Sequence, residues 1–219
     1  MIHNLKKIIK KKLMSDTSSF NSEDLSDIED EDTKSQTDKD KEKDKEKEKG
    51  KDKECICTEN INLINSISNT LETILEKNKQ LSNYKEIIIN QSKMYFSSFS
   101  VPEISIKEYL MRIQYYSGIE KSTLILSLIL IDKMCKKSGI LLTYYNIHRI
   151  LFSSLLISIK YNEDSYFDNT FYSQIAGVKP NELQLLEYTF LDYNEFNVFV
   201  KDFEYKQYEQ YLITNNSKK

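Results

Sequence analysis

The run TLILSLILI, residues 123–131, limits the possible folds of this chain more than any other stretch. It contains no charged residue, yet it is shorter than the roughly 18 apolar residues that a transmembrane helix needs. A helix that is apolar on nearly all sides has to be covered by other elements on most of them. We therefore predict a central, buried helix over residues 122–137, with Ser122 as its cap and Gly139 just beyond its end.

Amphipathic segments on both sides of this run predict the helices that cover it. Residues 106–117 begin with a capping box, formed by Ser105 and Glu108, and end before Gly118. The further helices that we expect are 143–160, opened by Thr143; 170–176, ended by Gly177; 181–191, capped by Asn181; and 195–212, capped by Asn194, which carries Phe196, Phe199, Phe203 and Tyr211. No strand pattern interrupts these segments, so the sequence predicts an all-α fold.

A heptad spacing precedes this helical region. The two series that recur every seven residues are Ile64, Leu71 and Asn78, and Ile67, Ile74, Leu81 and Ile88. This spacing predicts a one-faced helix over about residues 60–90. The stripe could pair with another chain as a short coiled coil. Such stripes more often pack on their own domain, and we favour that interpretation.

The N-terminal part of the chain has a composition that does not build a core. Residues 1–14 are basic, residues 15–32 are acidic, and residues 34–54 alternate lysine with acidic residues. Such a segment cannot bury enough apolar surface to offset its chain entropy. We therefore predict that residues 1–58 are disordered, with charge pairs giving at most transient helix. The basic start is open to three interpretations: a nuclear-import signal, a weak membrane-surface helix, or a solvated tail.

Charge and cysteine content argue against several classes of function. The net charge is −3, so a nucleic-acid footprint over the whole chain is not expected. Cys55, Cys57 and Cys135 form no disulfide framework, which indicates a reducing, intracellular compartment. No apolar run is long enough for a membrane span or a signal peptide, so we expect no membrane partner.

Catalytic and metal-binding motifs are missing from the sequence. Cys55 and Cys57 lie close together, but the two histidines have no spacing that would complete a zinc site. The chain has neither a glycine-rich phosphate loop nor a nucleophile–base pattern. We therefore expect no metal, no cofactor and no enzyme activity.

Two charged residues lie at positions where the pattern predicts burial. Arg112 stands between Leu110 and Ile113, and Asp132 ends the most apolar run of the chain. A lone buried charge is costly, so each residue needs a partner. Because a guanidinium binds a carboxylate through two parallel hydrogen bonds, we predict that Arg112 and Asp132 form a structural pair.

A lysine ends the helix predicted over residues 143–160. Lys160 follows a long apolar segment and precedes Tyr161, Glu163 and Asp164. These residues form either an ordinary surface loop or a polar contact that another protein must meet.

Four segments together resemble a cyclin box of the P/U type, the group that includes the fungal phosphate-pathway cyclin. They are PEISIKEYLMRIQYY, LSLILIDKM, NIHRILFSSLLISIKYNEDSYFDNTFYSQIAGVKPNELQLLEYTFL and FNVFVKDFEYKQYEQYL. The match covers about residues 95–212, in the family's order and spacing. The resemblance implies a single five-helix bundle around a central helix. The predicted organisation is then a tail over 1–58, a helix over 59–92, the cyclin box over 93–212 and a disordered end over 213–219.

The resemblance also implies a function and its residues. In this family, a lysine that ends the third box helix and a glutamate on the fifth bind a cyclin-dependent kinase, and these positions fall on Lys160 and Glu187. Tyr161, Glu163 and Asp164 would form an interface loop, and Arg112 and Asp132 would match the family's buried pair. The chain would thus be a nuclear or cytoplasmic regulatory subunit that favours the active conformation of its kinase, without contributing a catalytic group.

Two other functions compete with this interpretation. A cyclin-fold module of the transcription-factor type would bind DNA or a polymerase partner, although the expected basic face and paired repeats are not evident. A scaffold protein would instead dimerise through a coiled coil over residues 60–90.

Overall fold

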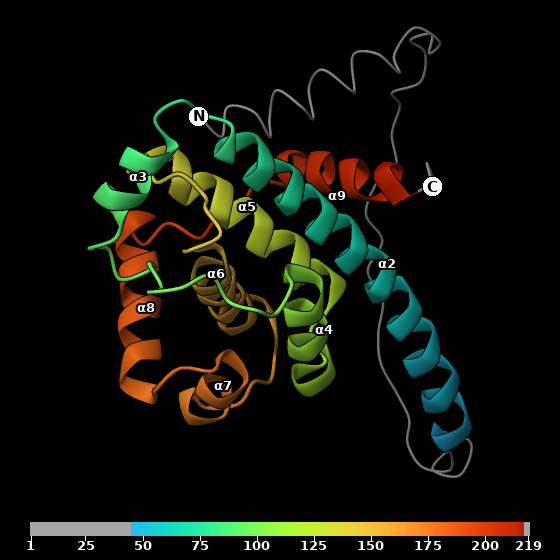
Figure 1. Ribbon diagram of the computed structural model, residues 1–219. Coiled ribbons are helices and arrows are strands. Elements are labelled where there is room, and N and C mark those ends of the chain that lie inside the picture. The colour runs from blue at the N-terminus through green and yellow to red at the C-terminus, as the bar shows by residue number, and fades with distance from the viewer. Residues whose placement is uncertain (1–44, 217–219) are drawn as a thin grey trace, which may run out of the picture.

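The computed structural model describes the backbone of residues 45–216 and the side chains of residues 60–214. Its elements are α2 (Lys45–Lys79), α3 (Tyr84–Gln91), α4 (Ile106–Ser117), α5 (Lys121–Ser138), α6 (Ile147–Asn162), α7 (Asn169–Ala176), α8 (Pro180–Tyr193) and α9 (Asp202–Asn216) (Figure 1). Residues 45–216 contain no strand, so the predicted all-α class is confirmed.

The core of the fold is built on α5 and α6. Every residue of α5 from Thr123 to Asp132 is buried, as the apolar run predicted. α6 is buried to the same extent from Ile150 to Ile159. The two helices pack on each other, α2 and α9 cover α5, and α7 and α8 cover α6 (Figure 1). The bundle therefore has two central helices where the sequence indicated one.

Local capping signals fix several helix ends. The Ser105 side chain accepts a hydrogen bond from the Glu108 amide, and the Glu108 side chain accepts one from the Ser105 amide, so the predicted capping box is present. α4 then ends at Gly118, whose φ of 62° lies in the left-handed region that glycine adopts without strain. The expected cap of α5 is wrong, because the helix starts one residue before Ser122, and Glu120 is its N-cap residue.

α6 begins at Ile147, four residues later than predicted from Thr143. The Asn146 side chain accepts a hydrogen bond from the Thr143 amide (2.8 Å) and donates one to the Leu141 carbonyl (2.9 Å). These two bonds hold the chain in a tight turn before the helix. Thr143, which the sequence predicted as the helix cap, is therefore part of the turn before the helix.

α9 begins at Asp202, so the prediction of a helix from residue 195 is wrong for its first turns. Asn194 is the C-cap residue of α8, and Glu195 and Phe196 both have positive φ values, 56° and 54°. Such a pair reverses the chain direction and cannot start a right-handed helix. The helix also continues to Asn216, past the predicted end, while residues 217–219 lie outside the described part.

The N-terminal helix is longer than predicted and is broken once. α2 already starts at Lys45, which corrects the expectation of disorder for residues 45–58. The sequence there places opposite charges three residues apart, a spacing that stabilises a helix. A turn over residues 80–83 separates α2 from α3, so the predicted single helix over 60–90 is two helices. The expectations for residues 1–44 lie outside the described part.

The apolar stripe of α2 is used inside the chain. Ile64, Ile67 and Leu71 are almost completely buried, and α2 packs against α4, α5 and α9. Asn60 donates a hydrogen bond to the Ile119 carbonyl (2.9 Å), which fixes the register of α2 on the bundle. Packing on its own domain, the favoured interpretation, is therefore confirmed, and the stripe is not free to form a coiled coil. None of the helices in the described part is long and apolar enough to cross a membrane.

Candidate functional site

Lys160 and Glu187, the two residues that the resemblance assigned to partner binding, lie together. The Lys160 ammonium donates a hydrogen bond to one Glu187 carboxylate oxygen over 2.6 Å. The second carboxylate oxygen accepts a hydrogen bond from the Asn169 side-chain amide (3.0 Å). The lysine and glutamate side chains keep 28% and 15% of their surfaces exposed, so the pair is held in place but can be reached from outside. Three helices, α6, α7 and α8, thus contribute to one polar centre.

The local sequence explains how each of these residues is positioned. α6 stays buried up to Ile159, so Lys160 is the first residue of its last turn that reaches the surface. Glu187 follows the buried Leu186 on α8 and lies beside the face that packs on α6. Asn169 is the first residue of α7, directly after the N-cap residue Asp168. The Asp168 carboxylate accepts a hydrogen bond from the Phe171 amide (2.8 Å), which fixes where α7 begins.

Removing this cap should loosen α7 by a small, measurable amount. We expect the substitution Asp168→Ala to lower the free energy of unfolding by about 1 kcal/mol, the usual cost of losing an N-cap side chain. Chemical denaturation followed by circular dichroism measures this change. Asp168→Asn keeps a hydrogen-bond acceptor at the same place and serves as the control. Its free energy of unfolding should fall by only about a few tenths of a kcal/mol. Equal losses in both variants would contradict a capping role.

The loop after Lys160 is only partly available to a partner. Tyr161 and Asp164 are exposed, as an interface loop requires. Glu163, in contrast, accepts a hydrogen bond from the Glu120 amide at the start of α5 (3.1 Å). Asn162 also donates to the hydroxyls of Ser122 and Thr123, at 2.9 Å each. The loop is therefore tied to α5, and Glu163 has a structural contact besides any role at an interface.

Exposed aromatic side chains directly follow both residues of the ion pair in the sequence. Tyr161 follows Lys160, Tyr188 follows Glu187, and both are more than half exposed. The Tyr188 ring meets the ring of Phe196 edge to face, with a distance of 5.9 Å between the ring centres. Phe196, an aromatic residue of the helix predicted over 195–212, is 57% exposed. We call Lys160, Glu187 and these three aromatic residues the Lys160–Glu187 surface.

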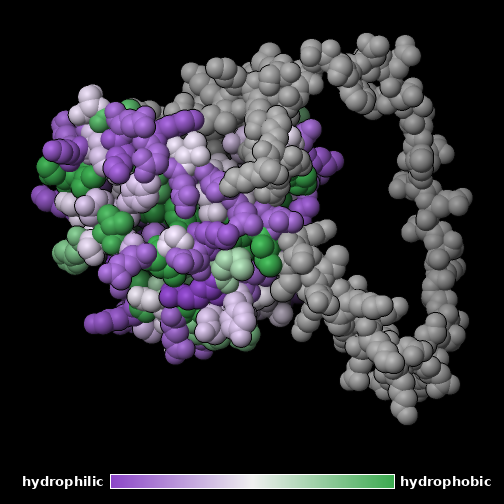
Figure 2. Space-filling view, turned by 45° about the vertical axis from the view of Figure 1, so that its right-hand side comes forward, coloured by the Kyte–Doolittle hydropathy of each residue, from purple (hydrophilic) through white to green (hydrophobic). Residues whose placement is uncertain are grey.

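Phe199 and Phe203, two other aromatic residues of that predicted helix, are also exposed. The buried residues of α9 are Tyr208 and Leu212. Figure 2 shows that, on the face that it draws, apolar side chains form small separate groups within a mostly hydrophilic surface. Exposed aromatic side chains are enriched at protein interfaces.

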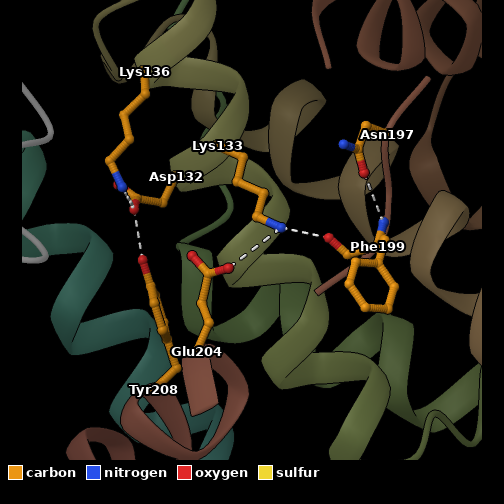
Figure 3. A network of polar contacts seen from close by, with 7 residues as sticks. All are labelled: Asp132, Lys133, Lys136, Asn197, Phe199, Glu204 and Tyr208. Carbon is orange, nitrogen blue, oxygen red and sulfur yellow. Dashed lines mark hydrogen bonds and ion pairs between the residues drawn. The ribbon is translucent and has the colours of Figure 1, made fainter. Parts of the chain in front are cut away.

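The predicted pair of Arg112 and Asp132 is not formed. A guanidinium nitrogen of Arg112 donates to the carbonyl of Ile175 on α7. The Asp132 carboxylate, which is 2% exposed, accepts hydrogen bonds from the Tyr208 hydroxyl (2.6 Å) and from Lys136 (Figure 3). Burial and the nearby Asp132 charge raise the pKa of Tyr208. Asp132 therefore has partners, as the cost of burying a lone charge predicted, but these partners lie on α5 and α9.

No catalytic or metal-binding arrangement stands out in the part of the chain whose side chains are described. Residues 60–214 contain no group of three or more histidine, cysteine, aspartate or glutamate side chains that could hold a metal ion. His148 is nine-tenths buried, and its Nε2 lies 2.9 Å from the Ile104 carbonyl oxygen. Burial lowers the pKa of His148, which keeps it neutral near pH 7. Cys55 and Cys57 lie on α2, in a segment whose side chains are not described.

Comparison with known proteins agrees with the resemblance found in the sequence. A model of the cyclin family, described simply as "Cyclin", matches residues 25–198. Cyclin-U4-2 of Arabidopsis thaliana is 32% identical over 132 residues, which are 59% of this chain and 60% of the relative. Cyclin-P3-1 of Oryza sativa subsp. japonica is 28% identical, over 65% of this chain and 60% of the relative.

A fungal protein is similar to the same region. PHO85 cyclin-like protein psl1 of Schizosaccharomyces pombe is 29% identical over 55% of this chain and 51% of its own length. The chain thus spans 51% to 60% of the length of these three relatives. The family match includes α4 to α8, and with them Lys160, Asn169 and Glu187.

Proposed function

The chain belongs to the cyclin family, with relatives of the U and P types, and we propose that it binds and activates a cyclin-dependent serine/threonine kinase. One observation carries this proposal: Lys160 and Glu187 form an ion pair that remains partly exposed at the surface. A fixed polar centre of this kind suits a partner segment that offers backbone hydrogen-bonding groups.

The ion pair is suited to binding the backbone of another protein. Glu187 already uses one oxygen for Lys160 and the other for Asn169, so its charge is compensated while the chain is alone. A carboxylate oxygen can accept more than one hydrogen bond, and a lysine ammonium has three protons to donate. Lys160 can therefore donate to a partner carbonyl, and Glu187 can accept from a partner amide, without breaking their own contact.

The proposed mechanism is a shift between two conformations of the kinase. In an active kinase, a glutamate of the αC helix pairs with the lysine that positions the ATP phosphates. A rigid surface that binds the αC-in conformation more tightly than the αC-out conformation shifts the equilibrium by the difference in affinity. The bundle offers such rigidity, because α6 and α8 place the ion pair from two packed helices of the core. The chain itself would contribute no catalytic group.

The experiment that tests this proposal combines binding with activity. The full-length chain is immobilised, exposed to a panel of purified cyclin-dependent kinases, and assayed for phosphorylation of a histone-type substrate. We expect at least one kinase to be retained and to gain at least about 100-fold in activity over the free kinase, because inactive conformations dominate without a cyclin.

A kinase that is retained without gaining activity would contradict the activation mechanism and leave only binding. If none of the panel is retained, and lysate of the source organism also yields no histone kinase activity on the immobilised chain, the proposal is wrong. The folded state of the immobilised protein is checked beforehand by its helical circular dichroism spectrum.

A further inference from the structure

A groove of about 920 Å³ lies beside α3, at the end of α2. The side chains that give this α3 groove its chemical character are apolar or basic: Leu81, Ile88, Val101, Lys79 and Lys85. None of the described residues that line it is an aspartate or a glutamate. Lys160 and Glu187 do not line it either, so the α3 groove is separate from the Lys160–Glu187 surface.

α3 is rich in apolar residues but has little cover. Ile87, Ile88 and Ile89 follow one another in this helix, yet none of its residues is buried. Ile89 is 68% exposed, and Val101, which lines the groove from the connector before α4, is 43% exposed. α3 makes no extensive contact with another helix of the described part and lies at the edge of the bundle (Figure 1). Exposed apolar surface of this kind marks a place where another segment binds.

The positive charge around the α3 groove is not balanced. Residues 77–93 contain four lysines and one glutamate. The Lys79 ammonium lies 3.9 Å from a Glu76 oxygen that also accepts a hydrogen bond from the Tyr144 hydroxyl (2.5 Å). No ion pair among the described side chains includes Lys85. A segment that covers the groove therefore has to bring negative charge together with apolar side chains.

One segment of the chain itself has this composition. Residues 15–32 contain eight acidic residues and no lysine or arginine, and they include Leu25 and Ile28. Residues 1–14 carry the opposite charge, and residues 34–54 alternate lysine with acidic residues. Of these three segments, only residues 15–32 match the α3 groove in both charge and apolar content.

The chain is long enough for this segment to reach the α3 groove. α2 rises about 1.5 Å per residue, so Lys45 and Lys79 lie roughly 50 Å apart along its axis. An extended chain spans about 3.4 Å per residue, so the roughly 20 residues from Leu25 to Lys45 reach about 65 Å. A tethered segment has an effective concentration on the order of millimolar. Even a dissociation constant of about 0.1 mM therefore keeps it bound most of the time.

We propose that residues 15–32 bind in the α3 groove of the same chain. Acidic side chains of this segment pair with Lys79 and Lys85, while Leu25 and Ile28 contact the apolar side chains of the groove. Bound in this way, the segment covers α3 and keeps other acidic partners out of the groove. The inference does not depend on kinase binding, because the groove contains neither Lys160 nor Glu187.

The test is photo-crosslinking in the full-length chain. Tyr84, which lines the α3 groove, is replaced by the photoreactive residue p-benzoyl-phenylalanine, and protein of monomer mass is digested and analysed by mass spectrometry after irradiation. We expect most cross-links from position 84 to reach residues 15–32. The same photoreactive residue at Tyr115, which is 82% exposed on α4 and does not line the groove, should give few cross-links to that segment.

A pair of charge reversals measures the role of the lysines. Lys79→Glu with Lys85→Glu should lower the yield of these cross-links at least about fivefold. Lys107→Glu with Lys179→Glu makes the same change in net charge at two exposed positions outside the groove, and should leave the yield unchanged. Equal yields in the two double variants would overturn the proposal.

Three further results would also contradict it. The first is the absence of cross-links from position 84 to residues 15–32. The second is that such cross-links occur only in protein of dimer mass, which would assign the α3 groove to a second copy of the chain. If Lys79→Glu with Lys85→Glu lacks the helical circular dichroism spectrum, Leu25→Ser with Ile28→Ser replaces it, since both positions precede α2. An unchanged yield in that variant is the third.

Discussion

Replacing Lys160 and Glu187 together by alanine is expected to lower the affinity for the partner kinase by about 100-fold while the fold stays intact. Residues at the centre of an interface typically cost about 2 kcal/mol or more when truncated, and 1.4 kcal/mol corresponds to a tenfold change. Removing both partners leaves no uncompensated charge behind, so the melting temperature should stay near that of the wild type. Kinase activity retained on the immobilised variant, relative to the wild type, measures the effect.

Two further variants separate the interface from a general charge effect. Lys121 and Glu209 form another lysine–glutamate ion pair, with 3.0 Å between nitrogen and oxygen and side chains that are 39% and 30% exposed. Replacing these two residues by alanine should leave kinase binding unchanged. The exchange Lys160→Glu with Glu187→Lys keeps an ion pair but reverses its direction, and should abolish binding in a folded protein. If the double alanine variant binds the kinase as tightly as the wild type, these two residues do not form the interface.

Removing the ammonium group of Lys136 is expected to cost about 3–5 kcal/mol of folding free energy, the range seen when a buried ion pair loses one partner. The substitution Lys136→Met keeps most of the aliphatic chain but leaves the Asp132 carboxylate, which is 2% exposed, with the Tyr208 hydroxyl as its remaining partner (Figure 3). One oxygen of this carboxylate already has no hydrogen-bond partner among the described residues, so no other cation there replaces the lost one. Chemical denaturation measures the loss.

The adjacent lysine is a matched control for this prediction. Lys137 is exposed to the same degree as Lys136, 34% against 32%, but its carboxylate partner Glu195 is 76% exposed. An ion pair of that kind contributes about 0–1 kcal/mol, and the hydrogen bond from Lys137 to the Asn194 carbonyl about 0.5–1.5 kcal/mol, so Lys137→Met should cost clearly less than Lys136→Met. Adding Asp132→Asn to Lys136→Met should recover part of the stability, because it removes the buried charge. Equal losses in the two methionine variants would show that burial of Asp132 does not decide the cost.

The helix ends that the sequence predicted well depend on residues close to one another in the chain. Ser105 and Glu108 lie three residues apart, and each satisfies a backbone group of the other. The glycine after α4 adopts the left-handed conformation that such a position requires. The position of Lys160 at the end of a buried helix also follows from the apolar pattern. Its contact with Glu187, 27 residues later, was implied by the family resemblance and not by spacing.

The predictions that failed depend on contacts between distant segments. The partner of Asp132 across the fold, Tyr208, lies 76 residues further along the chain, and nothing near Asp132 points to it. The start of α9 was misplaced because two lysines of α5 hold the preceding segment in another shape. Lys137 donates to the Asn194 carbonyl (2.9 Å) and Lys133 donates to the Phe199 carbonyl (2.6 Å). These tertiary bonds outweigh the local preference for a helix.

The contacts of Arg112 were missed for the same reason. The sequence assigned this guanidinium to the nearest suitable carboxylate, since a buried charge requires a partner. The structure instead turns it toward α7, where its described contacts are the Ile175 carbonyl and the Tyr109 ring. The cost of burying a charge identifies a residue that needs a partner. The packing of the helices decides which groups that residue contacts.

The contact between α2 and α9 also affects how the chain is made. The Ser66 hydroxyl donates to the Leu212 carbonyl over 2.6 Å, a contact between residues 146 positions apart. Because a ribosome releases the chain from its N-terminus, α2 leaves it long before α9 exists. Leu212, which is completely buried in the folded protein, is added 146 positions after Ser66. The part of α2 that α9 covers must therefore stay open to water or to a chaperone until α9 has been synthesised.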